Sequence, residues 1–314
     1  MTSTSVIICT RNRVNDLMKC MDSLTIQTRP IFELIIIDSG DRALDNVIGK
    51  YKNSLGIKYI RCKSSLTAAR NIGIKESRGD LIVFLDDDVV LDREYIYNVT
   101  HVFETYGKEV GAVSGNIISD ELRSRCFSSL IRYPVVRRSR NFVFKLFFLY
   151  GWGDGRFQPS GFPTHPIGKK DVRFIECLQG ASMTFRKEVF ENMKFDENLM
   201  GYCFMEDCDI SYRVAQQYKI IYTPYAKLYH NVSPASRDSD HLRMKMLIEN
   251  HHYLFNKNFP QRLYNRFTFW VSVMGLFFIS FLELNKDEIR GLLSGFKTIM
   301  HKTLRGLTVP RRGS

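Results

Sequence analysis

Paired cysteine motifs are missing from this sequence. Its seven cysteines are an odd number, and no two of them form a Cys-x-x-Cys pair. This spacing argues against a zinc site, and it favours a reducing compartment over a disulfide-stabilised secreted domain. The sequence also has no internal repeat, and because a strand-like run begins at residue 6 we expect no signal peptide.

Compositional extremes are absent as well. The chain has 314 residues, of which 44% are hydrophobic and 25% charged, and both fractions are ordinary for a globular protein. Wholesale disorder, collagen and coiled coil are therefore excluded. The length suits one large domain or two smaller ones, and it is sufficient to bury a substantial core.

Acidic residues are absent from one long segment. Residues 123–145 contain seven Lys or Arg and no Asp or Glu, and residues 284–314 contain seven Lys or Arg against two acids. These two segments account for the formal net charge of +12, so the rest of the chain is neutral overall. No recognisable RNA- or DNA-binding module contains these basic residues, and we expect no nucleic-acid partner.

Apolar runs alternate with helical patterns in the first part of the chain. The expected strands are residues 6–9, 34–37, 57–60, 81–85 and 110–113, and the expected helices include residues 66–77 and 92–105. Continuous apolar strands separated by helices are typical of a parallel sheet covered on both faces. We therefore expect a doubly wound α/β unit over residues 1–115, with ligands bound beyond the carboxyl ends of its strands.

Three consecutive acids, Asp86–Asp88, follow the expected strand at residues 81–85. Repulsion makes it costly to ionise three adjacent carboxylates unless a cation or hydrogen-bond donors lie nearby. A hard divalent cation bound by oxygen ligands would remove that cost. The alternative is a solvated turn before the helix that begins at Asp92. The position of the acids at the ligand edge of the sheet favours the metal site.

Two other strand ends carry polar residues. Asp38 follows residues 34–37 and can accept a hydrogen bond from a nucleobase or a ribose hydroxyl, although an Asx-turn is an alternative. Thr10–Arg13 end the first strand and open a helix. Backbone N–H groups and the side chains of Arg11 and Arg13 at that position suit a diphosphate.

A second acidic cluster contains Glu206 and Asp207. A carboxylate there could act as the general base toward an incoming hydroxyl, but acids are also favoured in the first turn of any helix. His230 ends the apolar run at residues 225–229. It is a candidate metal ligand, the alternative being an ordinary packed or surface histidine.

Taken together, these residues resemble the family 2 glycosyltransferases, which have the GT-A fold. The matching segments follow the family's order over about residues 3–232, and they are Val6–Arg13, Leu34–Asp38, Ala68–Gly73, Gly79–Asp88, Gln179–Ser182, Phe195–Glu197 and Glu206–Arg213. The resemblance implies an α/β catalytic domain over residues 1–232, with a mostly parallel central sheet and helices on both faces. Within it we expect a nucleotide-binding half at 1–115, a variable insert facing the acceptor or a membrane at 116–174, and an acceptor and base half at 175–232.

The resemblance also implies roles for individual residues. The donor nucleotide would be held by Thr10, Arg11, Arg13, Asp38, Arg70, Asp86 and Asp87. A divalent metal, Mg²⁺ or Mn²⁺, would be bound by Asp86, Asp88 and His230. The donor sugar and the acceptor would be lined by Gly180, Ala181 and Ser182, and Asp207 would be the catalytic base with Glu206 beside it.

The implied reaction is one direct displacement that inverts the anomeric carbon. The substrates would be a nucleotide-sugar donor and a hydroxyl of a glycan or lipid-linked glycan acceptor. Two departures from the family pattern occur in the sequence. Ser39–Asp41 replace the usual Asp-x-Ser pattern after the second strand, and Cys9 replaces a proline that often precedes the threonine.

Two other functions are compatible with this kind of sheet. A sugar nucleotidyltransferase needs a glycine-rich phosphate loop after the first strand, and Thr10–Arg13 contain no glycine. A catalytically inactive nucleotide-sugar-binding scaffold is the second alternative. The acids at 86–88 and at Asp207 are intact, which argues against it.

The basic segments flank the most apolar parts of the chain, which favours an anionic membrane surface as a partner. Residues 267–282 form a 16-residue, mostly apolar run, shorter than the roughly 20 residues needed to span a bilayer. From residue 284 an amphipathic helix is expected, with a helix packed on the core as the alternative. We therefore expect a helical, membrane-associating region over residues 233–314 and a peripheral or monotopic protein on the cytoplasmic side of a membrane.

Overall fold

The computed structural model describes residues 2–119, 147, 153–166, 168–199, 203–231, 233, 239–282 and 284–306. The chain divides into two compact units. The first contains residues 1–131, 152–157 and 163–237, and the second contains residues 132–151, 158–162 and 238–314. The basic segment at 123–145 lies outside the described residues. Each unit is described separately below.

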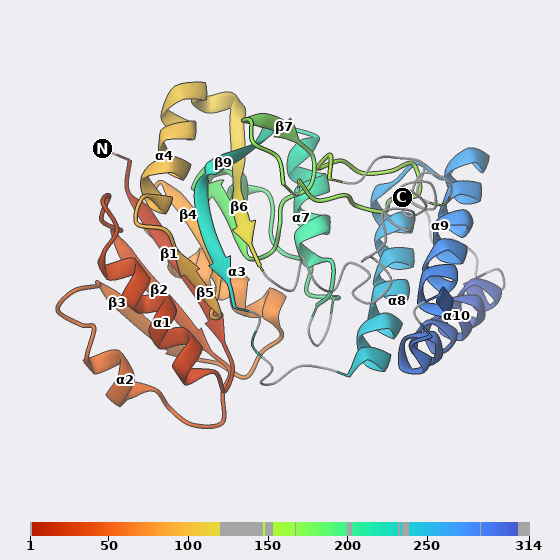
Figure 1. The fold of residues 1–314 in the computed structure, drawn as a ribbon, viewed down its shortest axis with the longest axis horizontal. Helices are drawn as coiled ribbons and strands as arrows, with labels where there is room; N and C mark the ends of the chain where they lie inside the picture. The colour runs from red at the N-terminus through yellow and green to blue at the C-terminus, as the bar shows by residue number, and fades with distance from the viewer. Residues whose placement is uncertain are drawn as a thin grey trace. The chain divides into compact units, whose positions relative to one another are not determined.

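The described residues of the first unit form a nine-stranded sheet (Figure 1). Its strands are β1 (Thr4–Thr10), β2 (Glu33–Asp38), β3 (Ile57–Arg61), β4 (Leu81–Asp86), β5 (Val89–Leu91), β6 (Val110–Ile118), β7 (Arg173–Ile175), β8 (Ser182–Arg186) and β9 (Lys219–His230). Their order is β3-β2-β1-β4-β8-β6-β9-β5, and β7 pairs with β9. The five strands expected from the sequence correspond to β1, β2, β3, β4 and β6.

The first four strands in this order are parallel, as their apolar runs predict. The fifth expected strand, β6, runs in the same direction but does not pair with β4. Strand β8 lies between them and is antiparallel to both. Strands β5 and β7 also pair antiparallel with β9. The sheet is therefore a parallel half joined to a mixed half, and the later segments of the chain complete it.

Helices cover both faces of this sheet because alternate strand residues point to opposite sides. Val6 and Ile8 face one core with helices α1 (Val14–Thr25), α2 (Asp45–Gly49) and α4 (Tyr95–Tyr106). Ile7 faces the other core with α3 (Leu66–Glu76) and α7 (Glu206–Ala215). Short 3₁₀ helices span Gly107–Glu109 and Lys187–Glu191.

Strand register brings the polar strand ends to one edge of the sheet. Thr10 at the end of β1 is the partner of Asp38 at the end of β2, and Cys9 is the partner of Asp86 at the end of β4. The end of β9 reaches the same place because His230 pairs with Val89 of β5, directly after the acids. The expected ligand edge is thus built from four strands.

The second unit contains α8 (Asp240–Asn258), α9 (Leu263–Leu282) and α10 (Lys286–Gly306). Its core includes Ile248, Phe269 and Leu292, one from each helix. Two glycines of α10 allow α8 to approach closely: a Cβ on Gly291 would lie 2.3 Å from the carbonyl oxygen of His241, and one on Gly295 would lie 2.1 Å from a methyl group of Ile248. Part of the apolar stripe of α10 therefore packs inside this unit. Among the described residues, no helix combines the length and apolarity that crossing a membrane requires.

His251 in α8 is a buried titratable group of the second unit. It has no exposed surface, it bonds through Nε2 to the carbonyl of Ser160 at 2.9 Å, and its ring lies against Phe269. Burial lowers its pKa from 6.5 to about 4. Between these two pH values the unfolded chain therefore binds a proton that the folded chain does not.

We expect the stability of this unit to be full above pH 6.5 and to fall by about 3 kcal/mol as the pH drops to 4, since one pKa unit corresponds to about 1.4 kcal/mol. The measurement is urea unfolding followed by the fluorescence of Trp270, in a Trp152→Phe background. His251→Gln should remove most of this pH dependence, whereas His101→Gln, at an exposed histidine of α4, should leave it unchanged. If the free energy of unfolding changed equally with pH in wild type and in His251→Gln, the assignment to His251 would be contradicted.

Candidate active site

The three acids after β4 have different partners. Asp88 is nearly buried: its Oδ1 lies 3.0 Å from Nε2 of His230, and its Oδ2 accepts a 2.9 Å hydrogen bond from the backbone N–H of Ser233. Burial alone would raise the pKa of Asp88, but the hydrogen bond and charge of His230 hold it below its ordinary value. Asp88 is therefore kept as a carboxylate.

Asp87 is bound to the turn that follows β1. Its Oδ2 accepts a 2.7 Å hydrogen bond from the hydroxyl of Thr10, and its Oδ1 accepts one of 3.1 Å from Nη1 of Arg13. The same guanidinium lies 3.6 Å from Asp88. Burial raises the pKa of Asp87 to about 6 despite both donors. The turn at 10–13 thus neutralises part of the acidic cluster.

Asp86, Asp88 and His230 could together hold a metal ion. One ligand atom from each lies within 4.8 Å of the others. Desolvation and the charge of Asp88 raise the pKa of Asp86, so a cation would relieve the repulsion between them. Two carboxylates with one imidazole suit Mg²⁺ or Mn²⁺. The donor set therefore fits a divalent cation.

Asp38 sits in a local hydrogen-bonded turn at the end of β2. Its Oδ1 accepts a 2.7 Å bond from the N–H of Gly40, which is the Asx-turn arrangement, and its Oδ2 accepts a 2.7 Å bond from the hydroxyl of Tyr59. The neighbouring loop is fixed as well, because Asn12 and Asp41 exchange two hydrogen bonds. Asp38 is thus rigidly placed beside Thr10.

Arg70 of α3 connects the two acidic clusters. Its Nη1 donates a 2.6 Å hydrogen bond to Oε1 of Glu206, and its Nη2 lies 3.6 Å from Oδ1 of Asp86. The guanidinium is almost completely buried and lies over the rings of Phe84 and Phe195. Burial lowers the pKa of Arg70, but the charges of Glu206 and Asp86 raise it by more than burial lowers it. Arg70 is therefore a permanent cation.

Glu206 and Asp207 begin helix α7 after Met205, whose φ of 73° turns the chain sharply into the helix. Both oxygens of Asp207 are held by backbone donors: Gly180 N–H at 3.0 Å and Cys208 N–H at 2.8 Å. Burial raises the pKa of Glu206 to about 7, with Arg70 opposing the rise and Asp207 adding to it. The two adjacent carboxylates therefore have different environments.

The loop at 180–182 reaches this cluster through its first residue. A Cβ on Gly180 would lie 3.4 Å from Asp207 and 3.5 Å from Glu206, so Gly180 borders both carboxylates. Ser182 is fully buried, and its hydroxyl bonds to the Tyr95 hydroxyl and the Gly115 N–H. Ala181 is buried in the core beside it.

Three contacts of the site were not anticipated from the sequence. Tyr59 bonds to Asp38, the N–H of Ser233 bonds to Asp88, and Arg70 pairs with Glu206. Tyr59 lies within an expected strand, where its hydroxyl carries no sequence signal. Arg11, in contrast, is exposed, and the described structure pairs it with neither acidic cluster.

A family model described as Glycosyl transferase family 2 matches residues 5–159. The uncharacterized glycosyltransferase YwdF of Bacillus subtilis (strain 168) is 24% identical over 233 residues, covering 74% of this chain and 75% of that protein. Glycosyltransferase AglE of Haloferax volcanii is 31% identical over 210 residues, covering 60% of this chain and 67% of that protein. Two uncharacterized glycosyltransferases of Rickettsia are much longer, and the match covers 16% of each.

The fold is also found among solved structures. The mannosyltransferase PcManGT from Pyrobaculum calidifontis, in complex with GDP-Man and Mn²⁺, has a TM-score of 0.55 to this chain at 14% identity. The similarity covers 98% of this chain and 83% of that one. At this level of identity the likeness concerns the fold. The α/β GT-A fold expected from the sequence is confirmed.

Because Arg70 is buried with its carboxylate partners, removing one partner should strongly lower the free energy of unfolding. Arg70→Met leaves Glu206 buried without its partner, which should cost about 3–5 kcal/mol in the free energy of unfolding. The double variant Arg70→Met/Glu206→Leu should recover most of that loss, because no uncompensated charge then remains between them. Urea unfolding of both single variants and the double variant forms the cycle. Additive losses would show that the pair is not coupled.

Proposed function

The chain belongs to the family 2 glycosyltransferases, and we propose that it transfers a sugar from a nucleotide-sugar donor to a hydroxyl of a glycan or lipid-linked glycan acceptor, with inversion at the anomeric carbon. The observation that carries this proposal is the buried bridge from Asp86 through Arg70 to Glu206. It holds a cation-binding cluster and a carboxylate pair in one unit of the protein, as a displacement between two substrates requires.

The donor half would bind the nucleotide diphosphate at the edge formed by β1, β2 and β4. Asp86, Asp88 and His230 would hold Mn²⁺ or Mg²⁺, which supplies charge stabilisation to the departing diphosphate. The presence of Mn²⁺ and GDP-Man in the PcManGT complex supports this choice of ligand class. Thr10, Arg13 and Asp87 form the network behind the metal ligands, and Asp38 would contact the nucleoside.

Asp207 would act as the general base. Its two oxygens accept hydrogen bonds from backbone N–H groups, which orient the carboxylate without using a side chain that could be displaced. A carboxylate held in this way can take the proton of the acceptor hydroxyl as its oxygen attacks the anomeric carbon. Glu206 would keep Arg70 in place, and Gly180, which borders both carboxylates, would line the sugar and the acceptor.

The two competing functions are less well supported. The turn at Thr10–Arg13 has no glycine, and its Thr10 and Arg13 side chains are engaged with Asp87, so it does not provide the phosphate loop of a nucleotidyltransferase. An inactive scaffold would bind the donor without releasing nucleotide. Release of nucleoside diphosphate, measured over a panel of UDP- and GDP-sugars with Mn²⁺, separates that case from an enzyme.

Asp207→Asn tests the base. We expect kcat to fall by at least about 10²-fold, since general base catalysis contributes roughly 10²–10⁴, while the Kd of the donor with Mn²⁺ changes less than about twofold. The amide keeps an oxygen acceptor for one backbone N–H, so the fold should persist. Asp45→Asn, an exposed acid in the first turn of α2, is the matched control with unchanged activity. A parallel loss of donor binding in Asp207→Asn would refute the assignment.

A second part of the proposal concerns location. We infer that the second unit associates with an anionic membrane surface on the cytoplasmic side. Helix α9 exposes large apolar side chains at helical spacing: Phe267 (67% exposed), Met274 (62%), Phe278 (40%) and Phe281 (66%). The exposed bases Arg262 and Arg266 stand at its first turn. An apolar stripe beside cationic residues suits an interfacial helix.

Helix α10, which was expected to provide this stripe, contributes Leu292 and Ile299 to the core of its own unit instead. Its removal would therefore expose core residues, and the test belongs on α9. We expect the triple variant Phe267→Ser/Met274→Ser/Phe281→Ser to bind anionic phosphatidylglycerol vesicles at least about tenfold more weakly in co-sedimentation, since burying each such side chain contributes about 1.5 kcal/mol or more.

The matched control replaces three exposed apolar residues of the first unit, Ile26→Ser/Phe32→Ser/Tyr225→Ser, whose side chains are 50–61% exposed. It should bind the vesicles as wild type does. Undiminished binding of the α9 variant would refute the membrane surface, and equal binding to neutral phosphatidylcholine vesicles would refute the contribution of the bases.

A further inference from the structure

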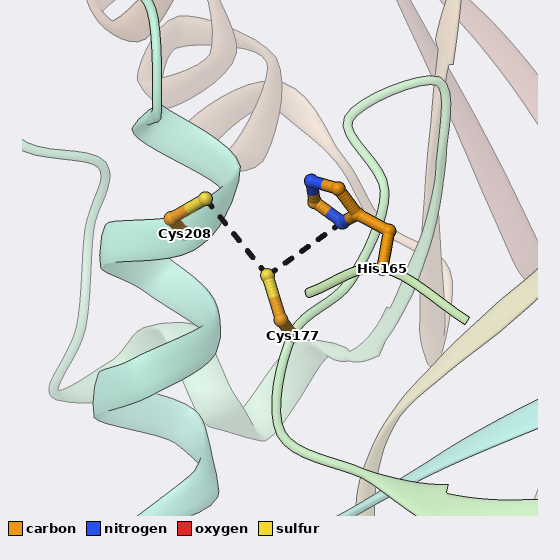
Figure 2. Close-up of side chains that lie close together, drawn as sticks. All are labelled: His165, Cys177 and Cys208. Atoms are coloured by element: carbon orange, nitrogen blue, oxygen red, sulfur yellow. Dashed lines mark hydrogen bonds between the residues drawn. The ribbon is translucent and has the colours of Figure 1, made fainter. Parts of the chain in front are cut away.

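A second group of metal-ligating side chains lies behind the candidate base. It consists of His165, Cys177 and Cys208 (Figure 2). His165 lies in the segment at 163–166, Cys177 is the second residue after β7, and Cys208 lies in the first turn of α7. Both cysteines are buried, and none of the three residues belongs to the cluster of Asp86, Asp88 and His230. The proposed reaction gives them no role.

The three ligand atoms point toward one another. The sulfur of Cys177 stands between the other two, 3.8 Å from the sulfur of Cys208 and 3.7 Å from Nδ1 of His165 (Figure 2). Ligand atoms of all three residues lie within 4.8 Å of one another. We refer to these three residues as the tripod.

These separations match the edges of a tetrahedral zinc site. With Zn–S bonds of about 2.3 Å and Zn–N bonds of about 2.0–2.1 Å, two sulfurs on one zinc ion are about 3.8 Å apart and a sulfur and a nitrogen about 3.6 Å apart. A disulfide, in contrast, requires its sulfurs at about 2.05 Å. The S–S and S–N separations at Cys177 therefore agree with a tetrahedral zinc site, and the third pair of ligand atoms lies within 4.8 Å.

The ligand chemistry also discriminates between metals. Two thiolates with one imidazole are soft and borderline donors that select zinc over Mg²⁺ or Mn²⁺, which prefer oxygen. Two thiolates and a neutral histidine balance the charge of Zn²⁺, so the complex carries no net charge in a buried position.

We propose that His165, Cys177 and Cys208 bind a zinc ion, with the fourth tetrahedral position left to a non-protein ligand. The ion joins three segments that are separated in the sequence. Since Cys208 directly follows Asp207, and its N–H already bonds to the Asp207 carboxylate, the site fixes the start of α7 and thereby the direction of the candidate base. The role is positional, and the ion takes no part in the displacement.

The first test is metal content. The full chain, purified under reducing conditions without chelator, should contain about one zinc per chain by mass spectrometry, and Co²⁺ exchanged into it should show thiolate-to-cobalt charge-transfer absorption. Wild-type protein that stays free of zinc after incubation with zinc sulfate and reductant overturns the proposal. So does a Cys177–Cys208 disulfide in protein kept under reductant.

The second test assigns the ligands. Cys177→Ser, Cys208→Ser and His165→Asn should each lower zinc content at least about tenfold, and His165→Cys should retain zinc because thiolate replaces imidazole in structural sites. Cys20→Ser, at a buried cysteine outside the tripod, and Asp88→Asn, in the other cluster, should keep the ion. Zinc lost from Cys20→Ser or Asp88→Asn to the same extent, or kept in all three ligand variants, overturns the assignment.

Discussion

One buried cation determines how the two halves of this site are joined. Arg70 has its guanidinium out of water, over the rings of Phe84 and Phe195, and its charge is balanced by Glu206 at 2.6 Å and Asp86 at 3.6 Å. A buried ion pair contributes little net stability, but losing one partner is costly. The positions of α3, β4 and α7 are therefore linked. Arg70 thus joins the candidate metal ligand Asp86 to the carboxylate of Glu206.

Much of this arrangement could be predicted because it depends on local pattern. The apolar runs at 34–37 and 81–85 are buried strands, and period-two side-chain alternation with parallel register places Asp38 and Asp86 at one edge. The placement of His230 beside Asp88 follows from the pairing of β9 with β5. The polar residues at strand ends therefore indicate the candidate metal ligands, whereas the GT-A fold was expected from the family resemblance of several segments in order.

Other features depend on long-range packing, which the sequence does not display. Strand β8 inserts between β4 and β6 although nothing in its short run indicates an antiparallel partner. The tripod was missed because its members are separated by 11 and 30 residues, so no Cys-x-x-Cys spacing marks it. The amphipathic pattern of α10 indicates an apolar face but cannot tell a membrane from the α8 and α9 core on which Leu292 packs.

The insertion of β8 has a consequence for synthesis on the ribosome. Strands β1 to β4 emerge first, but β4 has an unpaired edge until Ser182–Arg186 have been made, about 95 residues after Asp86. An exposed apolar edge strand invites pairing with other chains. The nascent protein must therefore pass through a long interval in which its best-formed sheet is also its most aggregation-prone surface. The candidate ligand His230 arrives later still, so a truncated product that ends before it lacks one member of the candidate metal site.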